Sequence, residues 1–257
     1  MSFSEFLPTA KTAAHLAGEV LRSWAERFTI TEKSPANLVT EADFAAQTVI
    51  HELIREKYPD HNFLGEEGLN ESHHASGFRW VIDPLDGTSN YAHRFPYYAV
   101  SIGLECEEEL VCGVIYDPTR DELFWTVKGE GAWVNEKRLS TSKNLTLDKA
   151  MLMASLPVAV RAHHPAVNRF LRAVGQAQTV QRSGSAALNL AYIAAGRLDG
   201  FWSTNLMPWD MAAGVLLVRE AGGVVTQLDG GTFRLERPSL LAANSENLHR
   251  EMVQMLA

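Results

Sequence analysis

Cysteine is scarce in this 257-residue sequence, in which only Cys106 and Cys112 occur, on either side of an acidic turn at 107–109. The two could face each other across a hairpin. So few cysteines are nevertheless more typical of free thiols in a reducing compartment than of a disulfide framework. We therefore expect a cytoplasmic protein.

Long apolar runs are missing as well. No stretch approaches the eighteen or so apolar residues that a membrane-spanning helix needs. Residues 1–5 lack the basic start and continuous apolar run of a signal peptide. The sequence thus predicts neither a membrane partner nor a secretory signal.

Positive charge is in deficit: 23 Lys and Arg residues stand against 31 Asp and Glu residues, a net charge of −8. Proteins that bind nucleic acid polymers normally need a face rich in Lys and Arg, so no such partner is expected. The glycine-rich and P-loop lysine motifs of nucleotide-binding folds are also missing. A phosphate substrate remains compatible with this charge, because bound cations reverse the sign of an acidic site.

The first half of the chain changes from helical to strand character. Apolar spacing predicts amphipathic helices over 9–28 and 41–57, the second opened by a capping box at 40–43. The apolar run 80–82 is expected to be a strand that Asp83 and Pro84 end. An antiparallel meander should follow, with strands at 97–105, 110–116, 122–127 and 132–134.

The second half alternates between strands and helices, which favours a sheet covered by helices. Strands are predicted at 151–156, 178–182, 198–202, 224–227 and 239–243, and helices near 165–175, 185–196, 210–221 and 246–256. The resulting α+β fold has two sheets and helical layers. We expect an N-terminal α+β subdomain over 1–147 and a C-terminal α/β subdomain over 148–257.

Carboxylates occur where strands end or helices begin, and they supply the strongest chemical signal. These residues are Asp43, Glu66, Asp83, Asp86 and Asp210. Pro84 keeps the residue before it extended, and a second carboxylate three residues later can reach the same point across a tight bend. Hard cations such as Mg²⁺ prefer oxygen ligands, which the two acids and the Leu85 carbonyl would offer. Two such ions can grip both oxygens of a phosphoryl transfer.

Gly87 and Thr88 follow directly and suggest how a phosphate is held. Glycine permits close approach of the backbone, so these two amides could point at a phosphate oxygen. Each acid also has a structural explanation taken alone. Asp43 and Asp210 could serve only as helix caps, Glu66 as a solvated turn residue, and Asp86 as half of a turn pair.

Four segments in order along the chain resemble the inositol monophosphatase family of lithium-sensitive, magnesium-dependent phosphatases. They are LVTEAD at 38–43, FLGEE at 63–67, WVIDPLDGTSN at 80–90 and WDMAAG at 209–214. The resemblance covers almost the whole chain. It implies a layered αβαβα sandwich with an antiparallel N-terminal sheet and a second, mixed sheet, usually assembled as a homodimer, with two or three Mg²⁺ ions.

The resemblance also implies a role for each site residue. One metal ion would be held by Glu66, Asp83 and the Leu85 carbonyl, a second by Asp83, Asp86 and Asp210, and a third, weaker one near Glu66. Glu66, Thr88 and Asp43 would be catalytic, with Thr88 orienting a metal-activated water for in-line attack. The Gly87 and Thr88 amides would hold the phosphate. Substrate contacts would come from Asp86, Gly184, Ser185, Ala186 and Ser203.

Two positions depart from the family pattern. Asn37 stands where the family generally has an acid, which affects the expected third ion or the loop around it. Ser203 stands where inositol monophosphatases have a glutamate that contacts inositol hydroxyls. One hydroxyl cannot bind two vicinal hydroxyls as a carboxylate does, and this weakens the inositol assignment.

The predicted function is hydrolysis of inositol monophosphate or a similar polyol or sugar phosphate. The alternatives are histidinol phosphate, fructose 1,6-bisphosphate or a 3′-phosphorylated adenosine nucleotide as substrate. A non-catalytic regulatory homologue is a further possibility, although such a protein would usually have lost one of the metal ligands, and here they are all present.

Overall fold

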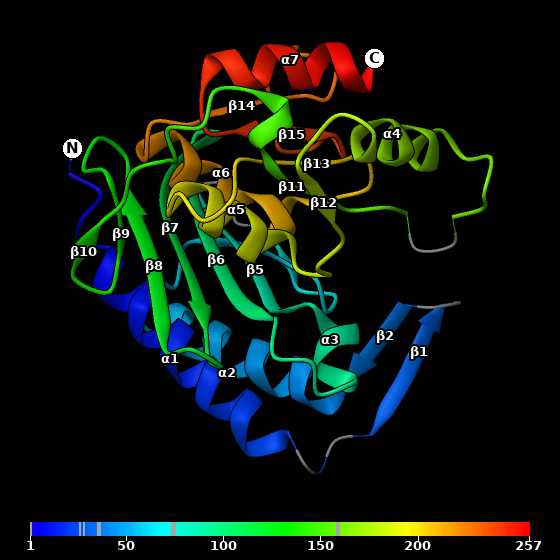
Figure 1. Cartoon of the computed structure of the whole chain (residues 1–257). Helices are drawn as coiled ribbons and strands as arrows, with labels where there is room; N and C mark the ends of the chain where they lie inside the picture. Colours follow the sequence, from blue (N-terminus) through cyan, green and yellow to red (C-terminus); the bar gives the residue numbers. More distant parts are fainter. Residues whose placement is uncertain (1, 26, 28, 35–36, 73–75, 158–159) are drawn as a thin grey trace.

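The computed structural model describes residues 2–25, 27, 29–34, 37–72, 76–157 and 160–257. They form five layers (Figure 1). The first layer holds α1 (Leu7–Trp24) and α2 (Glu41–Lys57), which cover an eight-stranded sheet. Helices α5 (Ala186–Ala194) and α6 (Pro208–Glu220) separate this sheet from a five-stranded one. On the outside of the smaller sheet lie α4 (Pro165–Val174) and α7 (Glu246–Leu256).

The larger sheet is antiparallel apart from the pair β3–β5. Its strands, from one edge to the other, are β10 (Lys137–Arg138), β9 (Ala132–Val134), β8 (Glu122–Val127), β7 (Glu109–Asp117), β6 (Ala99–Cys106), β5 (Phe78–Asp86), β3 (Asn62–Gly65) and β4 (Asn70–Glu71).

The smaller sheet is mixed, because β11 is parallel to both of its neighbours whereas β15 is antiparallel to both of its neighbours, β13 and β14. Its order is β12 (Thr179–Gln181), β11 (Met151–Ala154), β13 (Gly200–Ser203), β15 (Leu240–Ala243) and β14 (Val224–Thr226). The change from one sheet to the other lies between β10 and β11. The predicted domain boundary at 147/148 lies in this interval, and the division into two subdomains stays a prediction.

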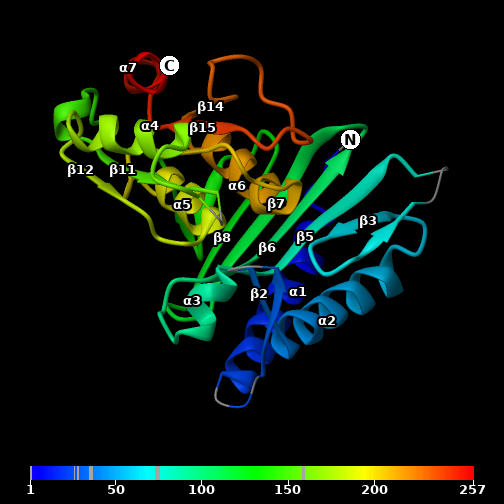
Figure 2. The same ribbon diagram turned by 90° about the vertical axis from the view of Figure 1, so that its right-hand side faces the viewer.

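A separate hairpin of β1 (Ile30–Ser34) and β2 (Asn37–Thr40) lies beside the short helix α3 (Thr88–Ala92). Figures 1 and 2 agree in placing both at one end of the large sheet. This end is where the acid-bearing segments 83–90 and 40–43 meet.

Helix α6 is buried on nearly all sides because it is sandwiched between the two sheets. It approaches the larger sheet closely at Gly103, where an added Cβ would lie 2.6 Å from the Cβ of Ala212. Glycine is therefore required at position 103 for α6 to pack this closely against β6. The same contact fixes the N-terminal turn of α6, which carries Asp210, over the end of the sheet.

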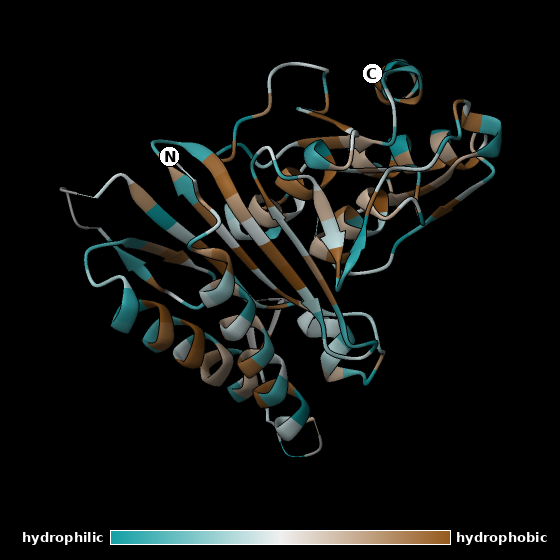
Figure 3. Cartoon of the chain, turned by 90° about the vertical axis from the view of Figure 1, so that its left-hand side faces the viewer, coloured by the Kyte–Doolittle hydropathy of each residue, from teal (hydrophilic) through white to brown (hydrophobic). Residues whose placement is uncertain are grey.

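The distribution of apolar residues matches these layers. Figure 3 shows brown, hydrophobic segments along the strands of the large sheet and mixed colouring on the helices that cover it. In the part of the chain that the structure describes, no helix is long and apolar enough to cross a membrane.

The predicted two-sheet α+β sandwich is confirmed. Helix α2 and strands β8 and β9 have the predicted bounds, whereas the first helix ends at Trp24 instead of residue 28. Strands β1 to β4 and helix α3 were not predicted. One local prediction is wrong: β5 does not stop at Asp83 and Pro84 but continues to Asp86.

Candidate active site

Asp83 and Asp86 lie near the C-terminal end of β5, where the strand is irregular. Asp83 is opposite Ser101 on β6 and Asp86 is opposite Ala99, so three steps along β5 match two steps along its neighbour. Successive side chains of a regular strand alternate between faces, which would send residues three apart to opposite sides. The extra residue of this bulge cancels that alternation. The irregularity thus lets both carboxyl groups face the same cavity.

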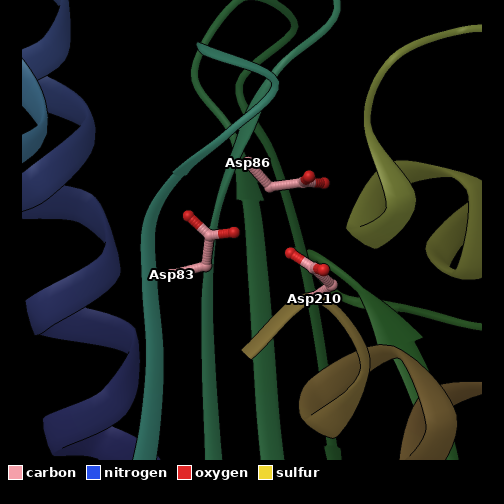
Figure 4. Close-up of side chains that lie close together, drawn as sticks. All are labelled: Asp83, Asp86 and Asp210. Atoms are coloured by element: carbon pink, nitrogen blue, oxygen red, sulfur yellow. The ribbon is translucent and has the colours of Figure 1, made fainter. Parts of the chain in front are cut away.

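Asp210 joins them from the second half of the chain. It is the third residue of α6, where one carboxylate oxygen accepts the Met207 N–H at 2.7 Å. Each of Asp83, Asp86 and Asp210 offers a ligand oxygen within 4.8 Å of the others. Figure 4 shows the three carboxyl groups pointing into a shared space between the end of β5 and the start of α6. We call these three residues the aspartate group.

The aspartate group is an assembly of like charges in a low-dielectric setting. Burial, followed by the charges of Glu66, Asp86 and Asp210, raises the pKa of Asp83 well above its usual range. The pKa of Asp210 is raised by burial and then by the charge of Asp86. Burial also raises the pKa of Asp86, to about 6. The set consists of oxygen donors only and carries excess negative charge, which fits a hard divalent cation.

Glu66 lies beside the group without belonging to its tight core. It follows β3, whose parallel neighbour is β5, and its backbone N–H donates to the Ile82 carbonyl at 3.2 Å. It lines the same cavity of about 570 Å³ as Asp83, Leu85 and Asp86. The carboxylate is close enough to raise the pKa values of Asp83 and Asp210.

Asp43 and Thr88 form a hydrogen-bonded pair at the edge of the cavity. Asp43 is fully buried and accepts the Thr40 backbone N–H at 2.8 Å, as a capping box requires. Its other oxygen lies 3.2 Å from the Thr88 hydroxyl, which is also 3.1 Å from the Leu85 carbonyl. Burial and then the charges of Glu67 and Glu66 raise the pKa of Asp43 to about 6. Capping the helix therefore does not prevent Asp43 from holding Thr88.

Gly87 connects the strand to α3 with a φ of 102°, which favours glycine. A Cβ there would lie 3.1 Å from the Tyr97 carbonyl. Helix α3 starts at Thr88, so its first amides have no partner inside the helix. Gly87 and Thr88 both line the cavity.

The predicted substrate contacts separate into two groups. Gly184 and Ala186 line the cavity, as does Asp86. Ser185 and Ser203 are fully buried and lie outside its lining. The Ser185 hydroxyl donates to Asp86, and that of Ser203 accepts the Asn205 N–H at 3.3 Å. The geometry therefore gives no support for direct substrate contact by these two serines.

The cavity wall also includes residues that were not predicted as site residues, among them Ser155, Leu156 and Leu206. Ser155 and Leu156 directly follow β11, which is parallel to β13. The end of the predicted strand at 151–156 could have indicated Ser155 and Leu156, because ligands bind at the edge of a sheet where the carboxyl ends of parallel strands meet. Residue 37 lies on β2, but its side chain falls outside the description, so the departure at Asn37 stays untested.

Comparison with known proteins gives concordant matches over nearly the whole chain. The model of the inositol monophosphatase family matches residues 3–257. An inositol-1-monophosphatase of Mesorhizobium japonicum is 42% identical over 248 residues, covering 95% of this chain and 93% of the relative. A protein of Pseudomonas aeruginosa named Nus factor SuhB is 40% identical over 248 residues, covering 93% and 92%.

Solved structures agree with these matches. The extragenic suppressor protein suhB of Bartonella henselae superposes with a TM-score of 0.93 at 37% identity and covers 98% of each chain. The inositol monophosphatase of Anabaena (Nostoc) gives a TM-score of 0.88 at 39% identity and covers 98% of this chain and 95% of its own. Both sheets and the cavity therefore lie within the shared architecture.

Proposed function

Because this chain belongs to the inositol monophosphatase family, we propose that it is a Mg²⁺-dependent phosphomonoesterase that hydrolyses inositol monophosphate or a similar polyol or sugar phosphate. The observation that carries the proposal is the aspartate group, three carboxylates within 4.8 Å of one another in a cavity of about 570 Å³. A like-charged group of this kind is costly without a cation and useful with one.

The residues that would hold the ions are Glu66, Asp83 and the Leu85 carbonyl for one, and the aspartate group for another. A third ion near Glu66 is part of the proposal. Bound divalent ions supply charge neutralisation for a phosphoryl group and a lowered pKa for water. The oxygen ligands would all come from this chain, and the Leu85 carbonyl oxygen, 3.1 Å from the Thr88 hydroxyl, has two lone pairs.

Thr88 would orient the attacking water. When its proton points to Asp43, its oxygen is free to accept a hydrogen bond from a water on the cavity side. The Gly87 and Thr88 amides would hold the phosphate oxygens opposite that water, which places attack in line with the leaving group. No covalent phosphoenzyme is required, because a water whose pKa is lowered by the metal would supply the nucleophile.

The leaving alcohol would lie against a rim formed by Arg182, Ser183, Gly184 and Ala186, which line the same cavity as the aspartate group. Ser203 is buried, so a glutamate-like contact to two hydroxyls is missing from this rim. Histidinol phosphate, fructose 1,6-bisphosphate and 3′-phosphorylated adenosine nucleotides therefore remain alternative substrates within the same proposal. A homodimer and inhibition by lithium are proposed from the family resemblance, and a cytoplasmic location is proposed from the two free cysteines.

The test is phosphate release from a panel of these esters, with and without Mg²⁺, by the wild type and by Asp86→Asn. We expect Mg²⁺-dependent turnover that the variant loses. Negligible turnover of inositol 1-phosphate beside rapid turnover of another ester would overturn the substrate choice. Undiminished turnover by Asp86→Asn would overturn the assigned metal site.

A second candidate, a non-catalytic role in assembly, is favoured by one observation: relatives of 39 to 40% identity carry the name Nus factor SuhB. Retention of all the acidic ligands argues for catalysis instead. An absence of phosphate release across the panel, in a protein that still binds Mg²⁺, would favour this second candidate.

A further inference from the structure

Hydrogen bonds join the segment 83–90 to the segment 182–187, across the boundary between the two sheets. The Ser185 hydroxyl donates to Oδ2 of Asp86 at 2.5 Å, and the Ala187 N–H donates to the same oxygen at 2.7 Å. The Asn90 side-chain amide donates to the Ser183 carbonyl at 2.8 Å. The segment 182–187 is therefore hydrogen-bonded directly to the segment that carries Asp83 and Asp86.

The proton of the Ser185 hydroxyl has a defined direction. Ser185 is the N-cap of α5, and its oxygen accepts the Leu188 N–H at 3.2 Å. Its single proton is thereby left for Asp86, whose carboxylate can only accept. The serine is fully buried, so it serves this bond and the helix cap and does not face a ligand.

Both of these hydrogen bonds end on Oδ2 of Asp86, and the same carboxylate offers an oxygen within 4.8 Å of those of Asp83 and Asp210. The first amides of α5 add the positive end of the helix dipole to the same side of the carboxylate. The start of α5 thus holds the Asp86 carboxylate in place beside those of Asp83 and Asp210.

We propose that Ser185 is a positioning residue that, with the start of α5, orients Asp86 as a metal ligand and so makes metal binding depend on the C-terminal half of the chain. The inference rests on the proposed function only in taking the aspartate group as a metal site. It replaces the predicted role of Ser185 as a substrate ligand.

Loss of an outer hydrogen bond to a metal ligand typically costs 10–100-fold in metal affinity. Ser185→Ala removes the hydroxyl donor to Oδ2 of Asp86 and leaves the Ala187 N–H, so the carboxylate is held less firmly. We expect Mn²⁺ to bind this variant at least about 10-fold more weakly than the wild type. At saturating metal the KM for the ester should stay near that of the wild type, because the hydroxyl does not touch substrate.

Ser245 provides a matched control at the start of α7. It is also a serine N-cap, accepting the Leu248 N–H at 3.4 Å and donating to a neighbouring side chain, the Asn244 amide oxygen, at 2.9 Å. Ser245→Ala thus removes the same two kinds of interaction at a helix start that does not line the cavity of the aspartate group. Ser185→Thr keeps the hydroxyl and should restore metal binding.

The experiment is Mn²⁺ titration followed by electron paramagnetic resonance on the full-length chain and these three variants, with thermal unfolding measured on each metal-free protein. The proposal predicts weak Mn²⁺ binding by Ser185→Ala alone. Wild-type binding by Ser185→Ala, or equal weakening by Ser245→Ala, would overturn it. If Ser185→Ala does not fold, Ser185→Thr decides: weakened binding by a folded Ser185→Thr also contradicts the proposal.

The two proposals fail separately. A protein that binds Mn²⁺ through Ser185 but hydrolyses no ester of the panel would refute the proposed function and keep this inference. A protein that hydrolyses an ester with Mg²⁺ and whose Ser185→Ala variant binds Mn²⁺ normally would do the reverse.

Discussion

Aspartates that are buried or half-buried occur in two very different settings in this molecule. The aspartate group at the end of β5 places three carboxyl groups together, and the charges acting on Asp83 are those of other acids. Asp199 is also buried, but four groups donate to its carboxylate: Ser142, Asn144, Asn244 and the Met151 N–H.

Asp117 illustrates the second setting equally well. It is fully buried beside Arg120 at 2.9 Å and accepts the Thr119 hydroxyl at 2.7 Å. Folding alone satisfies Asp117 and Asp199, whereas the aspartate group requires something positive from outside the chain. The comparison separates acids that stabilise the fold, such as Asp117 and Asp199, from acids that destabilise it but form a binding site, such as the aspartate group.

The largest expected effect sets Asp83→Asn against Asp117→Asn. Asp83→Asn should lower Mg²⁺-dependent phosphate release at least about 1000-fold, equivalent to about 4 kcal/mol, while the metal-free protein unfolds at an unchanged or higher temperature. Asp117→Asn should retain the rate and unfold at a lower temperature. Rate and calorimetric measurements on both variants would contradict the comparison if Asp83→Asn alone lost stability.

Two threonines that bond to buried aspartates extend the comparison, with the next largest expected effect. Thr88 bonds Asp43 and Thr119 bonds Asp117, each through its hydroxyl. Thr88→Ala should reduce turnover about 100-fold or more, since a positioned proton acceptor is lost, with KM little changed. Thr119→Ala should leave turnover at the wild-type value. Steady-state kinetics that rank the two variants equally would remove Thr88 from the proposed chemistry.

Asp199→Asn should cost about 1–3 kcal/mol of stability, because its new amide group would face donors in place of an acceptor. Phosphate release at low temperature should be unaffected, because Asp199 does not line the cavity. Urea unfolding measures the first effect and a phosphate assay the second. A loss of turnover without a loss of stability would contradict the structural role assigned to Asp199.

The smallest effect concerns pH. Asp43 and Asp86 have folded-state pKa values of about 6, above the usual 3.8. The metal-free folded protein therefore binds more protons than the unfolded chain between these values. Stability should rise by about 1 kcal/mol per group from about pH 7 to about pH 5. With saturating Mg²⁺ the trend should reverse, because protons then compete with the ion. Urea unfolding of the wild type and of Asp43→Asn at several pH values tests both trends, because histidines whose pKa values are lowered by burial act in the opposite direction in both proteins. A metal-free wild type that gains no more stability on acidification than Asp43→Asn would contradict the raised pKa of Asp43.

Much of this arrangement follows from local sequence. The capping box at 40–43 and the apolar spacing of α2 predict that helix with its observed bounds. The bulge in β5 was not predictable, because Asp83 and Pro84 indicate a strand end unless the pairing with β6 is known. The role of Ser185 was not predictable either, because its hydroxyl donates to Asp86, which is 99 positions away in the sequence. No local sequence pattern encodes such a contact.

The most direct test of a cation site at the aspartate group is a crystal grown with Mn²⁺ and measured for anomalous scattering. The account predicts at least one Mn²⁺ peak within bonding distance of Asp83, Asp86 and Asp210. Anomalous peaks confined to other parts of the protein, with this cavity holding only water, would contradict it.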